Sequence, residues 1–102
     1  MSTQHFSIAV AADHPAFVGH FPGHPVLPGV VLLAEVLAGM ERNLGLPVDR
    51  LLIRSAKFHA AVAPGSTLAV EVVCGTGIGF TVSCQGTRVA SGTIAAGTGG
   101  SA

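Results

Sequence analysis

Residues 18–31, VGHFPGHPVLPGVV, are the stretch that decides how this chain of 102 residues folds. The stretch holds two histidines, three prolines and three glycines, and it leads directly into an apolar segment. Proline fixes the backbone φ angle and glycine allows conformations closed to other residues, so this composition predicts a loop of defined shape. We expect the loop to hold the His20 imidazole beside the start of a buried helix, where it can transfer protons.

The segment after this loop has the composition of one long helix. Pro28 and Gly29 stand where a helix can begin, and residues 30–43 contain many good helix formers before Gly45 ends the pattern. The helix is apolar nearly all round as far as Met40, so we expect it to be buried on most of its sides. Other parts of the chain must therefore wrap it.

Short extended segments, rich in β-branched and other apolar residues, occupy much of the rest of the chain. The predicted strands cover residues 5–12, 51–58, 67–73, 80–84 and 88–95. Turn signals separate the last four strands, at residues 64–66, 75–77 and 85–87. These turns are spaced like hairpin connections, which favours antiparallel pairing between strands that follow one another.

This order of elements predicts an α+β protein, in which an antiparallel sheet curls around one long helix. We expect a single domain over residues 1–96, followed by a flexible tail at the Gly- and Ser-rich residues 97–102. A lone curled sheet leaves strand edges and one flank of the helix open. A second copy of the chain, or a related chain, is expected to cover them.

Composition excludes some partners. Hydrophobic residues make up 49% of the chain and charged residues only 10%, and the five basic and five acidic side chains cancel. There is no Trp or Tyr. Because a nucleic-acid-binding protein needs a basic surface and commonly uses aromatic stacking, we expect no nucleic-acid partner. A surface this poor in charge is expected to include an interface with another protein.

Cysteine usage and the length of the apolar run predict a cytoplasmic protein without a membrane span. Cys74 and Cys84 lack the spacing of metal ligands, and no signal peptide precedes them, so we expect two reduced thiols and no metal. The apolar run over residues 30–36 is interrupted by Glu35 and is much shorter than the roughly 20 residues that span a bilayer.

Residues 19–30, GHFPGHPVLPGV, closely resemble the signature of the hot-dog-fold 3-hydroxyacyl-acyl-carrier-protein dehydratases of fatty-acid synthesis. Residues 56–58 and 62–68 resemble that family's strand and turn after the helix, and residues 88–92 resemble its closing strand. The resemblance implies a hot-dog fold and a dimer whose two helices lie side by side. It also implies a lyase with no cofactor of its own, which removes water from a 3-hydroxyacyl chain on the phosphopantetheine arm of acyl carrier protein.

By this resemblance, His20 matches the catalytic histidine, which takes the C2 proton of the substrate and moves it toward the departing C3 hydroxyl. An imidazole suits this step because near neutral pH it is largely deprotonated and still basic. The backbone at Gly29 matches the N–H donors that receive the negative charge developing on the thioester oxygen, and Pro28 fixes their aim. The residues expected to contact the substrate are Phe21, Pro28, Val30 and Leu33.

The chain departs from the family at the second catalytic group, which is an acid on the central helix. The matching position holds Ala34, and Glu35 follows it. On an ideal helix these two side chains point about 100° apart. Burying a carboxylate without a partner costs several kcal/mol, which favours a purpose for Glu35.

Three arrangements follow from this departure. Glu35 replaces the acid after a local shift of the helix, or a partner chain brings an acid across the dimer interface, or the chain has kept acyl binding and lost dehydration. The intact loop around His20 favours the first two. A structural alternative is that Glu35 pairs with an arginine such as Arg54 or Arg88 at the interface.

Two other functions are compatible with the sequence. A hot-dog thioesterase or hydratase that acts on coenzyme A esters would share the fold and the acyl tunnel, although residues 19–23 argue against a thioesterase. A non-catalytic acyl-binding subunit could also complete a heterodimer with an active relative, and Ala34 supports this alternative.

Other side chains have simpler structural interpretations. Structural or loop-packing roles are expected for the remaining histidines, His5, His14, His24 and His59. Lys57 is expected on the exposed side of a strand and Phe58 in the core.

Overall fold

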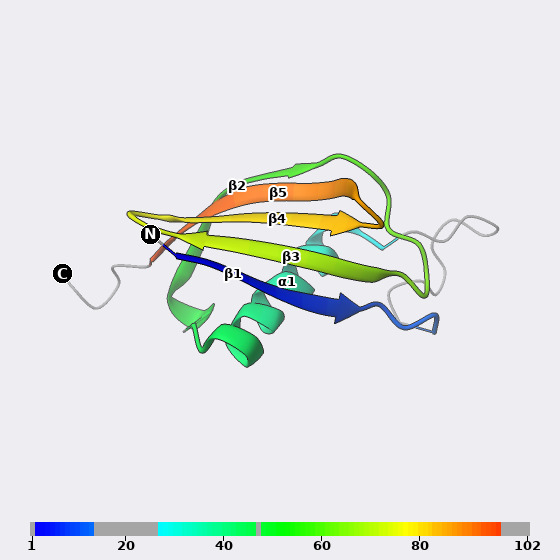
Figure 1. Cartoon of the computed structure of the whole chain (residues 1–102), viewed down its shortest axis with the longest axis horizontal. Coiled ribbons are helices and arrows are strands. Elements are labelled where there is room, and N and C mark those ends of the chain that lie inside the picture. Colours follow the sequence, from blue (N-terminus) through cyan, green and yellow to red (C-terminus); the bar gives the residue numbers. More distant parts are fainter. Residues whose placement is uncertain (1, 14–26, 47, 97–102) are drawn as a thin grey trace.

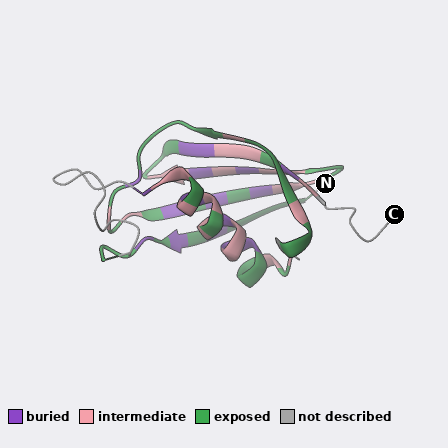
Figure 2. Ribbon diagram, turned by 180° about the vertical axis from the view of Figure 1, so that it is seen from behind, coloured by how far each residue is buried: buried purple, intermediate pink, exposed green. Residues whose placement is uncertain are grey.

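A computed structural model describes residues 2–13, 27–46 and 48–96 of the chain, and Figure 1 shows their arrangement. The elements are β1 (Ser2–Ala9), α1 (Gly29–Leu44), the short 3-10 helix η2 (Val48–Arg50), β2 (Leu51–Phe58), β3 (Thr67–Cys74), β4 (Ile78–Cys84) and β5 (Thr87–Ala96). A curved five-stranded sheet carries α1 across one face (Figures 1 and 2). This arrangement confirms the predicted α+β fold.

The strands lie in the order β1-β3-β4-β5-β2, and every neighbouring pair is antiparallel. Two predicted hairpins are confirmed, between β3 and β4 and between β4 and β5. The hairpin between β4 and β5 turns through Gln85 and Gly86. Both residues have a positive φ, which the two-residue type I′ turn of a β-hairpin requires. The two edge strands are β1 and β2.

The predicted hairpin at residues 64–66 is wrong. Strands β5 and β4 lie between β2 and β3, because β2 pairs with β5. The turn at residues 64–66 is instead fastened to the end of the first strand. The Gly65 N–H donates to the Val10 carbonyl at 2.9 Å, and the Val10 N–H donates to the Ser66 carbonyl at 2.8 Å. The first strand itself begins earlier than predicted and ends at Ala9.

The core lies between α1 and the face of the sheet that it covers (Figure 2). Four helical residues are buried, Leu32, Val36, Gly39 and Met40. The expectation that the helix would be buried on most sides is not met within this chain, because one sheet reaches only one side of it. Ala34 is exposed, and Val30 is 79% exposed. Within the described part of the chain, no helix is long and apolar enough to cross a membrane.

A glycine lets α1 approach the edge strand β1 closely. A Cβ atom on Gly39 would overlap the Cε2 atom of the Phe6 ring and would lie 3.0 Å from its Cζ atom. Phe6 is a buried core residue, so its ring has little room to move aside. The absence of a side chain at position 39 therefore sets how closely the helix packs on β1.

We expect Gly39→Ala to lower the free energy of unfolding by roughly 1–3 kcal/mol, because the added methyl group overpacks the core against Phe6. Urea denaturation measures this change. Gly79→Ala is the matched control, since a Cβ at Gly79 meets no atom within 4 Å, and it should leave stability unchanged or raise it by about 0.5 kcal/mol. Equal effects of the two substitutions would contradict the close contact at Gly39.

Candidate active site

The amino end of α1 presents backbone donors that the helix itself does not use. Pro28 precedes the helix with φ −59° and ψ 144°, and no side chain caps this end. The first intrahelical bond runs from the Leu32 N–H to the Pro28 carbonyl, at 3.0 Å. The N–H groups of residues 29–31 therefore precede the first hydrogen bond of the helix, and they lie at the positive end of the helix dipole. An anionic oxygen is stabilised at such a place.

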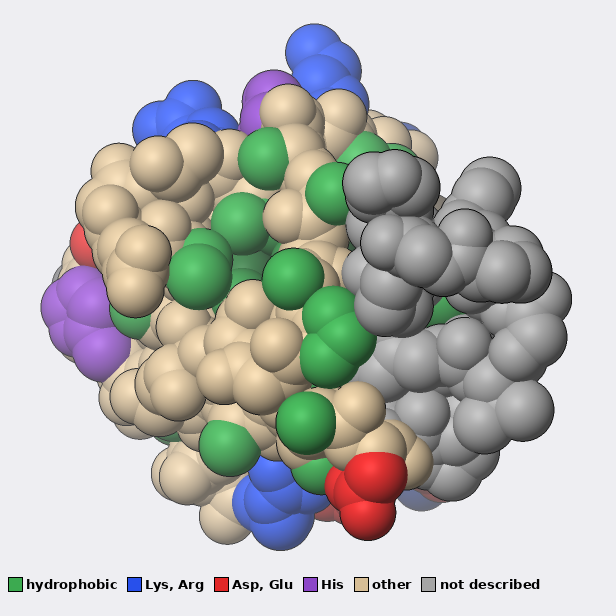
Figure 3. Space-filling view, turned by 90° about the vertical axis from the view of Figure 1, so that its right-hand side faces the viewer, with side chains coloured by type: hydrophobic (Ala, Val, Ile, Leu, Met, Phe, Trp, Pro, Cys, Tyr) green, Lys and Arg blue, Asp and Glu red, His purple; other side chains and the backbone are tan. Residues whose placement is uncertain are grey.

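An apolar pocket of about 450 Å³ lies beside this end of the helix. It is lined by Leu27, Gly29, Val30, Leu32, Phe58, Ala60, Ala61 and Val62. The Leu27 N–H donates to the Val62 carbonyl at 2.9 Å, which fastens the start of the helix to the connection between β2 and β3. Hydrophobic side chains gather in the middle of this end of the molecule (Figure 3). The volume suits a small-molecule ligand.

Phe58 forms one wall of the pocket. A Cβ atom on Gly29 would lie only 2.8 Å from the Phe58 Cζ atom, so the ring occupies the space beside the first residue of the helix. The prediction that Phe58 belongs to the core is wrong, because its side chain is 50% exposed at the end of the edge strand β2. Lys57 is exposed, as predicted.

The other sequence-predicted site residues are placed as follows. His20 and Phe21 lie outside the described residues, as do His14 and His24. Gly29 and Val30 both line the pocket, directly after Pro28. Leu33 is partly buried and packs against the hydrophobic core, and it is not among the described residues that line the pocket. The structure therefore brings the predicted donor backbone and one predicted contact, Val30, to the same pocket.

The two helical positions that bear on the missing acid face different ways. Helix α1 is continuous over Gly29–Leu44, so the angle between Ala34 and Glu35 is that of a regular helix. Ala34 lies on the exposed side, one turn after Val30. Glu35 is partly buried. It lies one helical turn before Gly39, which packs against Phe6 of β1, so Glu35 is on the side of the helix toward β1. Arg54, a suggested partner for it, belongs to the opposite edge strand.

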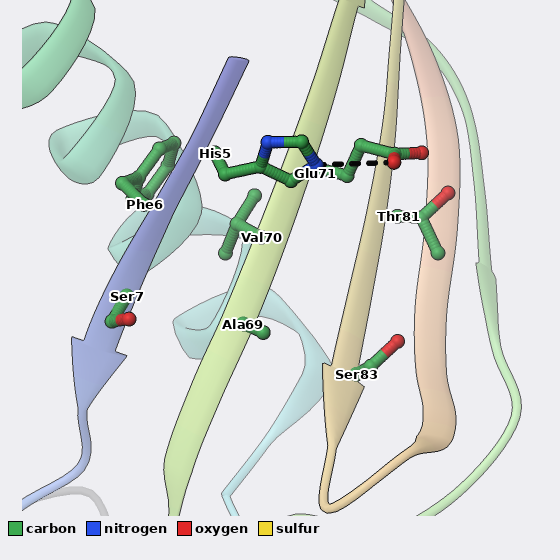
Figure 4. Close-up of a pocket in the computed structure, with 8 residues that line it drawn as sticks. All are labelled: His5, Phe6, Ser7, Ala69, Val70, Glu71, Thr81 and Ser83. Atoms are coloured by element: carbon green, nitrogen blue, oxygen red, sulfur yellow. Dashed lines mark hydrogen bonds and ion pairs between the residues drawn. The ribbon is translucent and has the colours of Figure 1, made fainter. Parts of the chain in front are cut away.

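A second hollow lies on the face of the sheet that α1 does not cover. Its labelled residues come from β1, β3 and β4 (Figure 4). The His5 Nε2 and Glu71 Oε2 atoms lie 3.2 Å apart there, and both side chains are exposed. Exposed pairs of this kind contribute less than about 1 kcal/mol. His59 lies near Ser91, with its Nε2 atom 3.1 Å from the hydroxyl oxygen.

Groups that could bind a metal do not gather in the described ranges 2–13, 27–46 and 48–96. No cluster of three or more His, Cys, Asp or Glu side chains with metal-binding geometry occurs there. The features that the candidate site offers at the amino end of α1 are its backbone N–H donors, its apolar walls and the loop that precedes the helix in sequence.

Comparisons with known proteins agree with this geometry. A family model described as ApeI-like, the ApeI dehydratase, matches residues 1–93. The 3-hydroxyacyl-[acyl-carrier-protein] dehydratase FabZ of Chloroflexus aggregans is 45% identical over 71 residues, covering 62% of this chain and 49% of that protein. FabZ of Thermus thermophilus is 41% identical over 70 residues, covering 61% and 49%. The chain thus spans about half the length of the curated relatives it matches.

Solved structures share the fold at low sequence identity. The dehydratase heterocomplex ApeI:P from Xenorhabdus doucetiae aligns with a TM-score of 0.73 and 22% identity, covering 91% of this chain and 85% of that one. The dehydratase domain of PpsC from Mycobacterium tuberculosis aligns with a TM-score of 0.71 and 19% identity, covering 92% and 38%. These likenesses establish the hot-dog fold.

We expect the effects of Gly29→Ala and Phe58→Ala on stability to be coupled. In the original chain the new methyl group must displace the Phe58 ring, whereas in the Phe58→Ala background that space is open. Gly29→Ala should therefore be more favourable in that background by about 1 kcal/mol, within the range found for residues in contact. A double-mutant cycle by urea denaturation measures this difference. Additive effects would show that the ring does not occupy this space in solution.

Proposed function

The chain belongs to the ApeI-like dehydratase family, and we propose that it removes water from 3-hydroxyacyl thioesters to give 2-enoyl thioesters. The observation that carries this proposal is the apolar pocket at the amino end of α1. Its walls suit an acyl chain, and the N–H groups beside it suit the thioester oxygen. The loop that contains His20 joins this end of the helix in sequence.

The reaction assigns one proton transfer to the histidine. His20 takes the proton from C2, and the electron pair of that bond moves toward the thioester, whose oxygen gains negative charge. The N–H groups of residues 29–31 stabilise this charge. The bond from C3 to its hydroxyl then breaks as the double bond forms between C2 and C3. His20 passes the abstracted proton to the departing hydroxyl, and the two leave as water, so no cofactor is required.

We further propose that the substrate is carried on the phosphopantetheine arm of acyl carrier protein in the cytoplasm. The similarity to FabZ proteins supports this carrier, since their name specifies it. Val30, at the pocket, is exposed. In this proposal the acyl chain lies in the pocket and the thioester lies beside the start of the helix.

A second hot-dog chain is the partner that we propose for the exposed side of α1. Val30 and Ala34 are exposed on this side, and the edge strand β2 exposes Leu52 and Ile53. Exposed apolar surface of this extent favours association. A partner there would also stand next to position 34, where the family's acid is missing, and could supply that acid.

Ala34 favours a second candidate function, a non-catalytic acyl-binding subunit of a heterodimeric dehydratase. The structurally similar ApeI:P assembly from Xenorhabdus doucetiae is a dehydratase heterocomplex, which supports this alternative. In this alternative the pocket and the backbone donors of this chain hold the acyl group, and the related chain performs the proton transfers.

We expect His20→Ala to abolish formation of 2-enoyl product from a 3-hydroxyacyl thioester, because the base is lost. The absorbance of the conjugated product measures the reaction. His59→Ala is the matched control, since the His59 ring lies beside Ser91 and His59 is not among the described residues that line the pocket, and it should retain activity. Activity unchanged by His20→Ala would contradict the proposed mechanism.

Assaying the chain alone and with a related hot-dog chain separates the two functions. Turnover by the chain alone supports the complete enzyme. Turnover that occurs only after the related chain is added supports the non-catalytic subunit, provided that His20→Ala in this chain leaves that turnover unaffected.

We expect Ala34→Arg to shift the chain from a dimer toward a monomer. The exposed position tolerates a larger side chain in the single chain, whereas in an interface it places a desolvated charge against apolar side chains. Sedimentation equilibrium measures the mass. Thr3→Arg is the control, because Thr3 is exposed on the edge strand β1, and it should leave the mass unchanged. A dimer that survives Ala34→Arg would contradict an interface at this side of α1.

A further inference from the structure

We propose that Phe58 is a specificity-determining residue whose ring limits the length of the acyl chain that the pocket accepts. The inference rests on the proposed function, because it concerns which substrates the same pocket takes. It starts from the place of the ring, which stands between the amino end of α1 and the last residues of the edge strand β2.

The ring is the largest side chain on its side of the pocket. The same side is otherwise lined by Ala60, Ala61 and Val62, which are small or buried. Three ring atoms of Phe58 lie 2.8, 3.0 and 3.1 Å from the place where a Cβ on Gly29 would be. The ring therefore closes the gap between strand and helix, and an acyl chain in the pocket meets it as a wall.

Behind the ring, the covered face of the sheet is built from small residues. Phe58 lies directly opposite Ala90 on β5, and the next pair on the same face is Ala56 with Gly92. A Cβ on Gly92 would lie 2.7 Å from the Phe80 ring, and Phe80 is buried, so this ring bounds the small-residue strip. Removing the Phe58 side chain would thus extend the pocket along β5 over Ala56 and Ala90.

The position also tolerates substitution. A side chain that is 50% exposed at the end of an edge strand contributes much less burial than a core phenylalanine such as Phe80. Replacing it should leave the fold intact, so a change in substrate preference can be measured on folded protein. The pocket that Phe58 borders explains why a large aromatic side chain stands at so exposed a position.

The test compares 3-hydroxybutyryl, 3-hydroxyoctanoyl and 3-hydroxydodecanoyl pantetheine thioesters, using the assembly that is active. The measured quantity is the ratio of kcat/KM for the longest chain to that for the shortest. Phe58→Ala should raise this ratio about tenfold or more, since even one methylene in an apolar pocket changes it by roughly tenfold. Phe58→Leu should raise it less, because leucine fills part of the space.

Lys57→Ala is the matched control, because Lys57 is exposed on the same strand, next to Phe58, and is not among the described residues that line the pocket. It should leave the ratio unchanged. A ratio that Phe58→Ala also leaves unchanged, or a shift that Lys57→Ala reproduces, would overturn the proposal.

A binding measurement separates this proposal from the proposed function. Calorimetric titration with unreactive S-alkyl pantetheine thioethers of increasing chain length requires no turnover. If the original protein turns over no thioester, the proposed reaction fails, yet Phe58→Ala should still strengthen binding of the long thioether relative to the short one by about tenfold. Equal binding preferences in the original protein and in Phe58→Ala, or no binding at all, would overturn the role of Phe58.

Discussion

The contact between Gly39 and the buried Phe6 ring sets how the helix packs on the sheet, and the rest of the structure depends on it, while a second glycine–phenylalanine contact lies at the other edge. Gly39 packs against Phe6 of β1, and Gly29 lies against Phe58 of β2. Because β1 and β2 are the two edges of the sheet, the helix contacts a phenylalanine ring at each edge. A side chain at Gly39 would push the helix away from the sheet by about the size of a methyl group, which well-packed cores do not absorb freely, whereas a side chain at Gly29 meets a half-exposed ring.

The two contacts differ in what surrounds the ring, and this difference separates stability from function. Phe6 is buried within the core, so its contact with Gly39 fixes the packing distance. Phe58 is half exposed, so its contact with Gly29 leaves a pocket at the open end of the helix. The same kind of contact thus anchors the helix at one place and forms a wall of the apolar pocket at the other. In the proposed function, the chemistry takes place where packing is incomplete and backbone donors remain.

The sequence predicts the elements of this fold well and their long-range pairing less well. The tight turn at Gln85 and Gly86 and the helix end at Gly45 are set by local backbone preferences, and both are confirmed. The pairing of β2 with β5 depends on residues far apart in the chain, so the spacing of the turn at residues 64–66 suggested the wrong neighbour. The exposure of Phe58 is not predicted either, because it depends on the last residue of β2 lying beside the open amino end of the helix, which is also a long-range arrangement.

The exposed side of α1 connects association to the chemistry of the pocket. Val30 belongs to both, since it lines the pocket and is exposed on the helix. A chain that covered Val30 and Ala34 would also exclude water from the neighbouring helix start. Electrostatic interactions strengthen as water is removed, so the N–H groups of residues 29–31 would stabilise an anionic oxygen more strongly in the assembly than in the single chain. In the proposed assembly, transition-state stabilisation would therefore depend on the same surface as association.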